Sequence, residues 1–214
     1  MADLPPPAYH SNVRTDIAPL VPRSKRLLDV GGGTGATARH LRGIGIADQV
    51  GVLDAVADKD RDGLDFAAAC NLDDPAAVDA FCHRHGPFDT ILFLDVLEHL
   101  VDPWASVKRF SRHLNPGGAM VASIPNVRHL STSAGLLFGN RWHYTDAGLL
   151  DRTHLRFFVR DTAIALMQVP GLRIERVEPS PIGRRLYKLI NGLTLGRLRS
   201  LFTLQYFVVA RRDD

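Results

Sequence analysis

The stretch Leu27-Leu28-Asp29-Val30-Gly31-Gly32-Gly33-Thr34-Gly35-Ala36 decides the fold of this chain. A short apolar run ends in an acidic residue and a glycine cluster, and a helical pattern follows over residues 36–42. This order is typical of a β-strand, a tight turn and a helix N-terminus. Glycines permit positive φ and let a ligand approach the backbone, and the helix start offers unpaired N–H groups with partial positive charge. We therefore expect a nucleoside-like ligand at this turn.

The glycine cluster by itself leaves the identity of that ligand open. Gly31, Gly33 and Ala36 match G-x-G-x-x-A, the fingerprint of dinucleotide-binding folds. Asp54 then follows near the spacing expected for a ribose-binding acid. Gly31, Gly33 and Gly35 equally match G-x-G-x-G, which suits a nucleoside without a pyrophosphate. A tight strand–helix turn without any ligand is the third alternative.

Strand and helix patterns alternate along the chain up to residue 125. Such alternation predicts a parallel sheet that is covered by helices on both faces. Beyond residue 158 we expect a helix over 161–168 and two further strands over 172–178 and 204–210. In the first part we expect strands over 26–30, 49–53, 67–72, 90–94 and 119–124, and helices over 36–42, 75–83 and 103–114.

Length, charge and cysteine content limit the classes of protein to which this chain can belong. A length of 214 residues is enough for one sizeable core. The net charge of +3 and the pI near 9.1 are too weakly basic to indicate nucleic acid as a partner. Cys70 and Cys82 provide no disulfide framework and fit a reducing, cytoplasmic location. No apolar run of about 18 residues occurs, so we expect no transmembrane segment. For the assembly, we consider a homodimer.

Three motifs, in this order, closely resemble class I S-adenosylmethionine-dependent methyltransferases. They are LLDVGGGTG at 27–35, FDTILFLDVLEHL at 88–100 and LNPGG at 114–118. Two further segments, SIPNVRH at 123–129 and GLLDRTHLRFF at 148–158, resemble a bacterial subgroup associated with glycan and O-antigen biosynthesis. They are similar also to the O-methyltransferases of ubiquinone biosynthesis. The resemblance covers about residues 25–180.

This resemblance implies a Rossmann-like methyltransferase fold. The class is α/β and doubly wound, with a mostly parallel seven-stranded sheet, an antiparallel last strand over 204–210 and a cap insert. The basic and apolar segment 183–201 is expected to be an amphipathic helix on the cap; a peripheral membrane contact is the alternative if the acceptor is lipid-linked. The segments would be a leader over the cofactor site (1–24), the cofactor-binding core (25–125), a substrate cap (126–158) and the C-terminal part of the same domain (159–214).

The resemblance also implies S-adenosylmethionine as cofactor and S-adenosylhomocysteine as product. Asp29 and the glycine turn would hold the methionine part. An acid after the second strand would bind both ribose hydroxyls, because a carboxylate accepts two hydrogen bonds; Leu53 occupies that position and Asp54 is next to it. Tyr9 and Arg14 would close over the sulfonium and the carboxylate, unless the leader is a disordered tail. The expected cofactor-binding residues are Asp29, Gly31, Gly33, Thr34, Gly35, Asp54, Asn71, Leu72, Asp95, Tyr9 and Arg14.

Asp95, Glu98 and His99 follow the fourth expected strand, at the edge where open α/β sheets bind ligands. Their spacing of three and four places them on one face of a helix start. In one hypothesis His99 is a general base for an acceptor hydroxyl, since its ordinary pKa is near 6.5. In a second, Asp95, Glu98, His99 and His154 bind a divalent cation such as Mg²⁺, as in metal-dependent ubiquinone-pathway enzymes and small-RNA terminal 2′-O-methyltransferases. A purely local structural role is the third.

The sequence thus predicts an enzyme that O-methylates a hydroxyl of a sugar, a glycan or another polyhydroxylated small metabolite. The catalytic candidates are His99, Glu98, His129 and His154. The alternatives are an NAD(P)-dependent oxidoreductase and a non-catalytic subunit that binds S-adenosylmethionine and regulates a partner. RNA is a less favoured acceptor because the charge is modest and no aromatic-and-basic signature is present.

Overall fold

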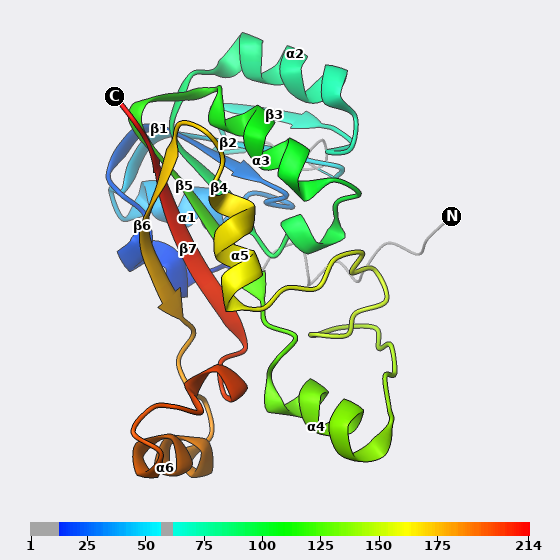
Figure 1. The fold of residues 1–214 in the computed structure, drawn as a ribbon. Helices are drawn as coiled ribbons and strands as arrows, with labels where there is room; N and C mark the ends of the chain where they lie inside the picture. Colours follow the sequence, from blue (N-terminus) through cyan, green and yellow to red (C-terminus); the bar gives the residue numbers. More distant parts are fainter. Residues whose placement is uncertain (1–12, 57–61) are drawn as a thin grey trace.

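A seven-stranded sheet forms the centre of the computed structural model, which describes residues 13–56 and 62–214 (Figure 1). The strands lie in the order β3-β2-β1-β4-β5-β7-β6. Strands β1 to β5 pair in parallel, whereas β7 is antiparallel to both β5 and β6. The predicted doubly wound sheet with an antiparallel last strand is confirmed. The strands are β1 (Ser24–Val30), β2 (Ala47–Asp54), β3 (Phe66–Ala69), β4 (Phe88–Leu94), β5 (Leu114–Pro125), β6 (Leu172–Pro179) and β7 (Gln205–Arg212).

Helices cover both faces of the sheet, which explains why the strands are apolar on both sides. Helix α1 (Ala36–Gly43) and a 3-10 turn (Thr15–Leu20) bury Leu41 and Ile17 against one face. Helices α2 (Pro75–His85), α3 (Pro103–Ser111) and α5 (Arg160–Met167) cover the other, with Phe81, Phe110 and Leu166 in its core. None of the helices among the described residues is long and apolar enough to cross a bilayer.

Local signals set where two of these helices begin. Asp74 precedes α2, and its carboxylate accepts hydrogen bonds from the N–H groups of Ala76 and Ala77 (3.0 and 3.2 Å). Asp102 precedes α3 and accepts from the N–H of Ala105 at 2.9 Å. Each cap is followed by a proline at the first helical position, where a missing N–H has no consequence.

Two elements differ from the sequence prediction in extent. The third strand ends at Ala69 rather than at residue 72, because the chain turns at Asn71, whose side chain accepts the N–H of Asp73 at 3.1 Å. Helix α3 ends at Ser111, since β5 begins already at Leu114 rather than at residue 119. The extra residues lie at the start of β5, where Leu114 pairs with Phe88 of β4.

The cap segment 126–158 is anchored at its two ends. Asn126 forms an isolated bridge with Phe158, and the N–H of Val127 donates to the carbonyl of Phe158 at 2.9 Å. The side-chain amide of Asn126 donates to the carbonyls of Ser200 and Thr203, both at 2.8 Å. One residue therefore joins the cap to the segment before β7. Between these anchors the chain forms helix α4 (Leu130–Gly139).

The prediction of one helix over 183–201 is wrong in extent. Helix α6 spans only Arg185–Leu193, and a 3-10 turn (Arg199–Leu201) follows it. The helix ends where Leu195 and Gly196 both take positive φ (50° and 80°), a conformation that no right-handed helix continues. The ring of Tyr187 stacks on Phe202 at 4.7 Å between centroids, yet no residue of α6 is buried.

We predict that Gly51→Ala destabilises the fold, because β2 and β3 leave no space for a side chain there. A Cβ at Gly51 would lie 2.0 Å from Cδ2 of Phe66 and 2.4 Å from its carbonyl oxygen. Overpacking of this kind lowers the free energy of unfolding by about 1–3 kcal/mol, to be measured by urea denaturation. Gly43→Ala, with nothing within 4 Å of the added Cβ, is the control. An unchanged midpoint for Gly51→Ala would contradict the packing.

Candidate active site

The glycine turn lies where the carboxyl ends of β1, β2 and β4 meet. The N–H of Gly31 donates to the carbonyl of Leu53 at 2.8 Å, and the N–H of Gly33 donates to Oδ2 of Asp54 at 2.9 Å. Gly31, Gly33 and Gly35 have φ of 71°, 57° and 85°. A Cβ on Gly31 would also lie 2.4 Å from Cγ2 of Val96. The turn therefore requires glycine for both conformation and space, and it leaves the N-terminus of α1 open to the crevice.

Asp54 is the acid available at the end of β2. It is the last residue of that strand, and its Oδ1 accepts the N–H of Val56 at 2.8 Å. Leu53, at the position where the resembled family has its acid, is fully buried in the core. A role of Asp54 at the ribose is thus compatible with the geometry, while Leu53 serves packing.

Asp29 is a buried carboxylate near the end of β1. Within the part of the chain that the structure describes, neither of its oxygens has a hydrogen-bond partner. Burial and, to a smaller extent, the negative charge of Asp54 raise the pKa of Asp29 to about 7, although Arg14 offsets part of the effect. Such a group is costly unless it is paired, which is expected of a residue that meets a ligand's donors rather than the protein's own.

Arg14 spans the carboxyl edge from the N-terminal segment. Its guanidinium makes an ion pair with Asp95, donates to Oγ of Ser123 at 3.3 Å and contacts Asp16 at 2.9 Å. Asp95 follows β4 with a positive φ of 57°, and its Oδ1 accepts the hydroxyl of Ser123 at 2.8 Å. Tyr9, the other leader residue expected at the cofactor, lies outside the described residues.

The remaining cofactor candidates also lie at this edge of the sheet. Thr34 is part of the glycine turn. Asn71 and Leu72 follow β3, where Asn71 is exposed and Leu72 packs partly against the core. Their position after a parallel strand places them on the ligand-binding side of the fold.

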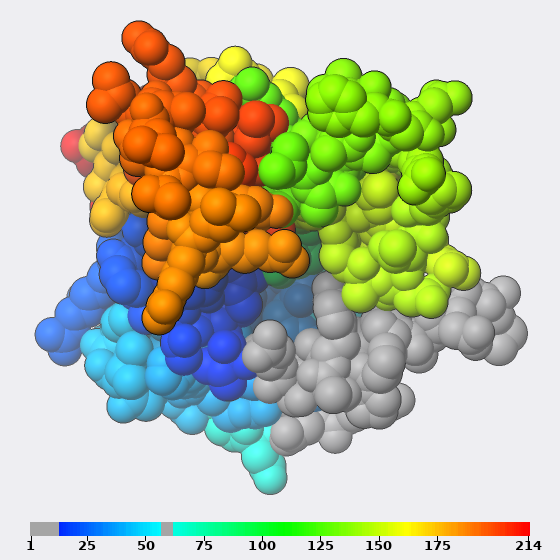
Figure 2. Space-filling view, turned by 90° about the horizontal axis from the view of Figure 1, so that it is seen from below, coloured from blue at the N-terminus to red at the C-terminus, as the bar shows by residue number. Residues whose placement is uncertain are grey.

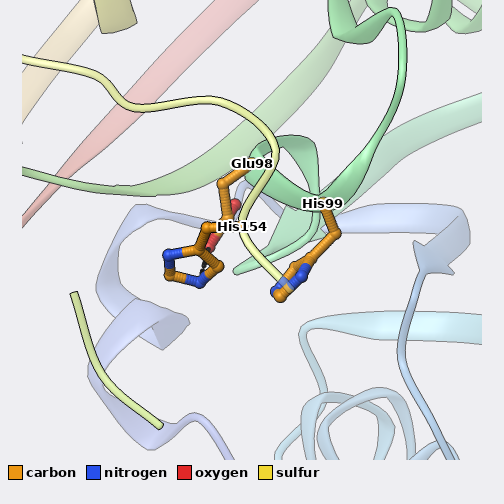
Figure 3. A group of neighbouring side chains, drawn as sticks. All are labelled: Glu98, His99 and His154. Atoms are coloured by element: carbon orange, nitrogen blue, oxygen red, sulfur yellow. Dashed lines mark ion pairs between the residues drawn. The ribbon is translucent and has the colours of Figure 1, made fainter. Parts of the chain in front are cut away.

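Glu98, His99 and His154 form a cluster beside the end of β4 (Figure 3). Glu98 and His99 lie on a 3-10 turn (Leu97–His99), and His154 comes from the cap. One ligand atom of each residue lies within 4.8 Å of the others. The two imidazole rings meet edge to face, with 4.7 Å between centroids.

The backbone of Glu98 fixes this arrangement. Its carbonyl accepts the N–H groups of Leu155 (2.8 Å) and Arg156 (3.0 Å), the residues that directly follow His154. The returning arm of the cap is thereby tied to the turn after β4. The cluster depends on this main-chain contact and not on side-chain attraction alone.

The electrostatics of the cluster suit proton transfer or ligation. Both carboxylate oxygens of Glu98 are buried and have no hydrogen bond to a described residue. Burial together with the charge of Asp95 raises the pKa of Glu98 well above its usual range. Burial and the neighbouring His154 lower the pKa of His99. Nδ1 of His99 lies 3.2 Å from the carbonyl of Thr153, so we assign the proton to Nδ1. Its Nε2 then keeps a free lone pair.

Two of the expected residues lie outside this cluster. Asp95 was expected among the metal ligands, but its carboxylate is held by Arg14 and Ser123. His129 was expected to be catalytic, but it caps helix α4, with Nδ1 2.8 Å from Oγ of Ser131. Asp95 is held by residues distant in sequence and His129 by capping of a helix, and neither contact could be read from the motifs.

A cavity of about 740 Å³ opens between the cap and two members of the cluster, Glu98 and His154, whereas His99 lies behind its lining. Sequence analysis missed several of its lining residues, among them Arg141, Asp151 and Gln205. Asp151 could have been found from the GLLDRTH motif, since it stands three residues before His154. No sequence motif indicated Gln205 as a site residue, because it is simply the first residue of β7.

The sequence is similar to known methyltransferases. Residues 8–177 match the family described as methyltransferase domain, and the chain belongs to that family. It is 32% identical over 104 residues to a ubiquinone biosynthesis O-methyltransferase of Caulobacter vibrioides, and 32% identical over 139 residues to a tRNA 5-carboxymethoxyuridine methyltransferase of Escherichia coli. These matches cover 47% and 62% of this chain, but 40% and 52% of the two relatives.

The fold agrees with this assignment. A methyltransferase from Archaeoglobus fulgidus that depends on S-adenosylmethionine superposes with a TM-score of 0.61, at 17% identity, over 96% of this chain and 93% of that one. The chain therefore belongs to the methyltransferase-domain family and has the fold of S-adenosylmethionine-dependent methyltransferases, as the resemblance implied. The alternatives of an NAD(P)-dependent oxidoreductase and a non-catalytic subunit are not adopted.

We predict that Asp29→Asn stabilises the ligand-free protein, and more so at alkaline pH. An acid whose pKa is raised by folding holds its proton in the folded state, so stability is lost as pH rises from about 4 to about 7. The variant lacks this loss, so its advantage in free energy of unfolding should be roughly 2 to 3 kcal/mol larger at pH 8 than at pH 5.

Chemical denaturation at the two pH values measures this difference. Asp48→Asn, an exposed change on β2, is the matched control and should show no such dependence. If Asp29→Asn changes the free energy of unfolding equally at both pH values, ionisation of Asp29 does not destabilise the folded state and the prediction is wrong.

Proposed function

We propose that this enzyme transfers the methyl group of S-adenosylmethionine to a hydroxyl oxygen of a sugar, a glycan or another polyhydroxylated small metabolite. The observation that supports it most is the cluster of Glu98, His99 and His154 next to a 740 Å³ cavity, on the same sheet edge as the glycine turn. A relative named as an O-methyltransferase supports the choice of oxygen. The two free thiols, Cys70 and Cys82, fit a cytoplasmic location.

The cofactor would lie along the carboxyl ends of β1, β2 and β3. The glycine turn and Asp29 would hold its methionine part, and Asp54 its ribose. Asn71 and Leu72 would border the adenine. Arg14 would meet the methionine carboxylate, since a guanidinium binds carboxylates in a bidentate manner; it would then exchange part of its contact with Asp95.

The acceptor would occupy the cavity between cluster and cap. Its hydroxyl oxygen attacks the methyl carbon in line with the C–S bond, the sulfur leaves as the neutral thioether of S-adenosylhomocysteine, and the hydroxyl proton passes to a base. Nε2 of His99 is suited to take that proton. Positioning contributes much of the rate, because the sulfonium is already a good leaving group.

A divalent cation is the second hypothesis for the same cluster. The donor set fits one: the Glu98 carboxylate, whose Oε1 lies 4.0 Å from Nε2 of His154, and two imidazoles, all within reach of one ion. A bound cation would lower the pKa of an acceptor hydroxyl. Glu98, His99 and His154 would hold it, and Asp95 would stay with Arg14.

Isothermal titration tests the cofactor assignment. We expect S-adenosylmethionine to bind and NAD⁺ not to bind, each measured with and without Mg²⁺. Gly31→Ala should weaken S-adenosylmethionine binding at least about tenfold, because its Cβ would meet Val96 and its φ is positive. Gly171→Ala is the control, since that glycine has a similar φ of 84° but open space around it. Binding of NAD⁺ alone would refute the assignment of the turn.

Substitution of the cluster tests the catalytic proposal. His99→Ala and Glu98→Gln should each lower kcat by roughly 10²–10⁴-fold, with the affinity for S-adenosylmethionine changed less than about twofold, since neither is placed at the cofactor. Transfer of labelled methyl groups to a panel of sugars and polyols measures kcat. The exposed His83→Ala is the control.

A chelator separates the two hypotheses. Activity that is lost with EDTA and restored by Mg²⁺ would support the cation, and activity that is unaffected would support His99 as base. Full activity of His99→Ala on any acceptor would contradict both.

A further inference from the structure

Two segments at one end of the molecule present large apolar side chains to solvent. The end of α4 presents Leu137 and Phe138, which are 74% and 88% exposed. The region of α6 presents Leu193 and Leu195, at 77% and 85%. Both segments lie at the lower end of the ribbon, away from α2 (Figure 1). Single exposed apolar residues are ordinary, whereas a group of this size usually marks an interaction site.

Helix α6 carries an apolar stripe that is largely exposed. Leu186, Leu189, Ile190 and Leu193 recur at the spacing that places them on one helix face. Leu186 and Leu189 are each 61% exposed. A helix of nine residues gains little from propensity in water, so such a stripe is expected to be covered when the protein acts.

The two stretches that contain these segments have an excess of positive charge. Residues 126–145 and 179–204 contain seven Lys and Arg residues and no Asp or Glu. The rest of the chain keeps nineteen of the 26 basic residues and all 23 acidic ones, so it is net negative. The seven are Arg128, Arg141, Arg184, Arg185, Lys188, Arg197 and Arg199.

We propose that the end of α4 (residues 136–138) and the α6 region (residues 184–199) form a docking surface for an anionic lipid bilayer. Apolar side chains enter the boundary between headgroups and acyl chains, while Lys and Arg meet lipid phosphates. A second copy of the chain would bring the same positive charges against this surface. RNA would pair with the charges but leave Leu137, Phe138 and Leu193 in water.

The active-site cavity opens between the two halves of this surface. Ser131 and Gly135 of α4 line one side, and Leu204, which follows the α6 region, lines the other. Figure 2 shows the two segments on either side of a recess. Docking therefore turns the cavity mouth toward the headgroups, where a membrane-anchored acceptor would present its hydroxyl. This last consequence rests on the proposed function, whereas docking does not.

Co-sedimentation of the full chain with vesicles tests the surface. Phosphatidylcholine vesicles that contain about one third phosphatidylglycerol should bind the protein, and pure phosphatidylcholine vesicles should bind it at least tenfold more weakly. Binding should fall as salt is raised, because salt screens the charges. The assay contains neither cofactor nor acceptor, so failure of methyl transfer does not affect it.

A double substitution of apolar residues on the surface, compared with one elsewhere, distinguishes specific docking from nonspecific hydrophobic adsorption. Phe138→Ser with Leu193→Ser should lower vesicle binding at least about tenfold, since each buries a large apolar side chain in the bilayer. Ile44→Ser with Val101→Ser, which are 51% and 57% exposed elsewhere, should change it less than about twofold. All four side chains are exposed, and thermal unfolding confirms that the variants fold.

A charge variant tests the electrostatic part in the same assay. Arg185→Gln, Lys188→Gln and Arg197→Gln together should lower binding to anionic vesicles at least about tenfold, since each charge near the surface contributes about fivefold. The exposed triple Lys25→Gln, Arg84→Gln and Lys108→Gln is the control for an equal loss of charge.

Three results would overturn the proposal. The first is no sedimentation with anionic vesicles, or equal sedimentation with neutral ones. The second is an equal loss of binding in the control variants. The third is binding of a single-stranded RNA, or dimerisation lost in Phe138→Ser with Leu193→Ser, in a protein that does not bind vesicles.

Discussion

The two hydrogen bonds at the carbonyl of Glu98 are the contact on which the active site depends. The N–H groups of Leu155 and Arg156 donate to this oxygen and thereby connect the cap to the turn after β4. Together with the contact of His99 Nδ1 and the carbonyl of Thr153 (3.2 Å), they set the position of His154 relative to Glu98 and His99. A backbone contact of this kind tolerates changes in side chains, so the cap can vary in its lining while the cluster keeps its geometry.

The site carries a stability penalty that the fold must offset. Asp29 and Glu98 are buried carboxylates whose oxygens have no hydrogen bond to residues 13–56 or 62–214, and burial raises the pKa of both. Uncompensated groups of this kind are rare in proteins and concentrate where ligands bind. The two apolar layers on the faces of the sheet supply the stability that permits them.

Much of the fold could be predicted from local patterns. The alternation of apolar runs with helical patterns predicted the sheet and its covering helices. Strands that are buried on both faces are continuous apolar runs, and such runs can be read from the sequence. The boundaries were less certain: Asn71 ends β3 early, and Leu195 ends α6 early, through turns that compete with propensity. At the site, Glu98 and His99 were predictable because they are neighbours in one motif.

The sequence by itself determined the order of the elements, the glycine turn and the pairing of Glu98 with His99, since each depends on residues close together in the chain. The resemblance placed His154 in one set with Glu98 and His99, and the structure brings the three together. Only the tertiary structure decided that Arg14 holds Asp95 and that His129 caps α4. It alone also decided that Phe138 and Leu193 stay in solvent. The physical reason is that these features depend on which distant segments meet, and hydrogen bonds or exposure between distant segments leave no periodic trace in a single sequence.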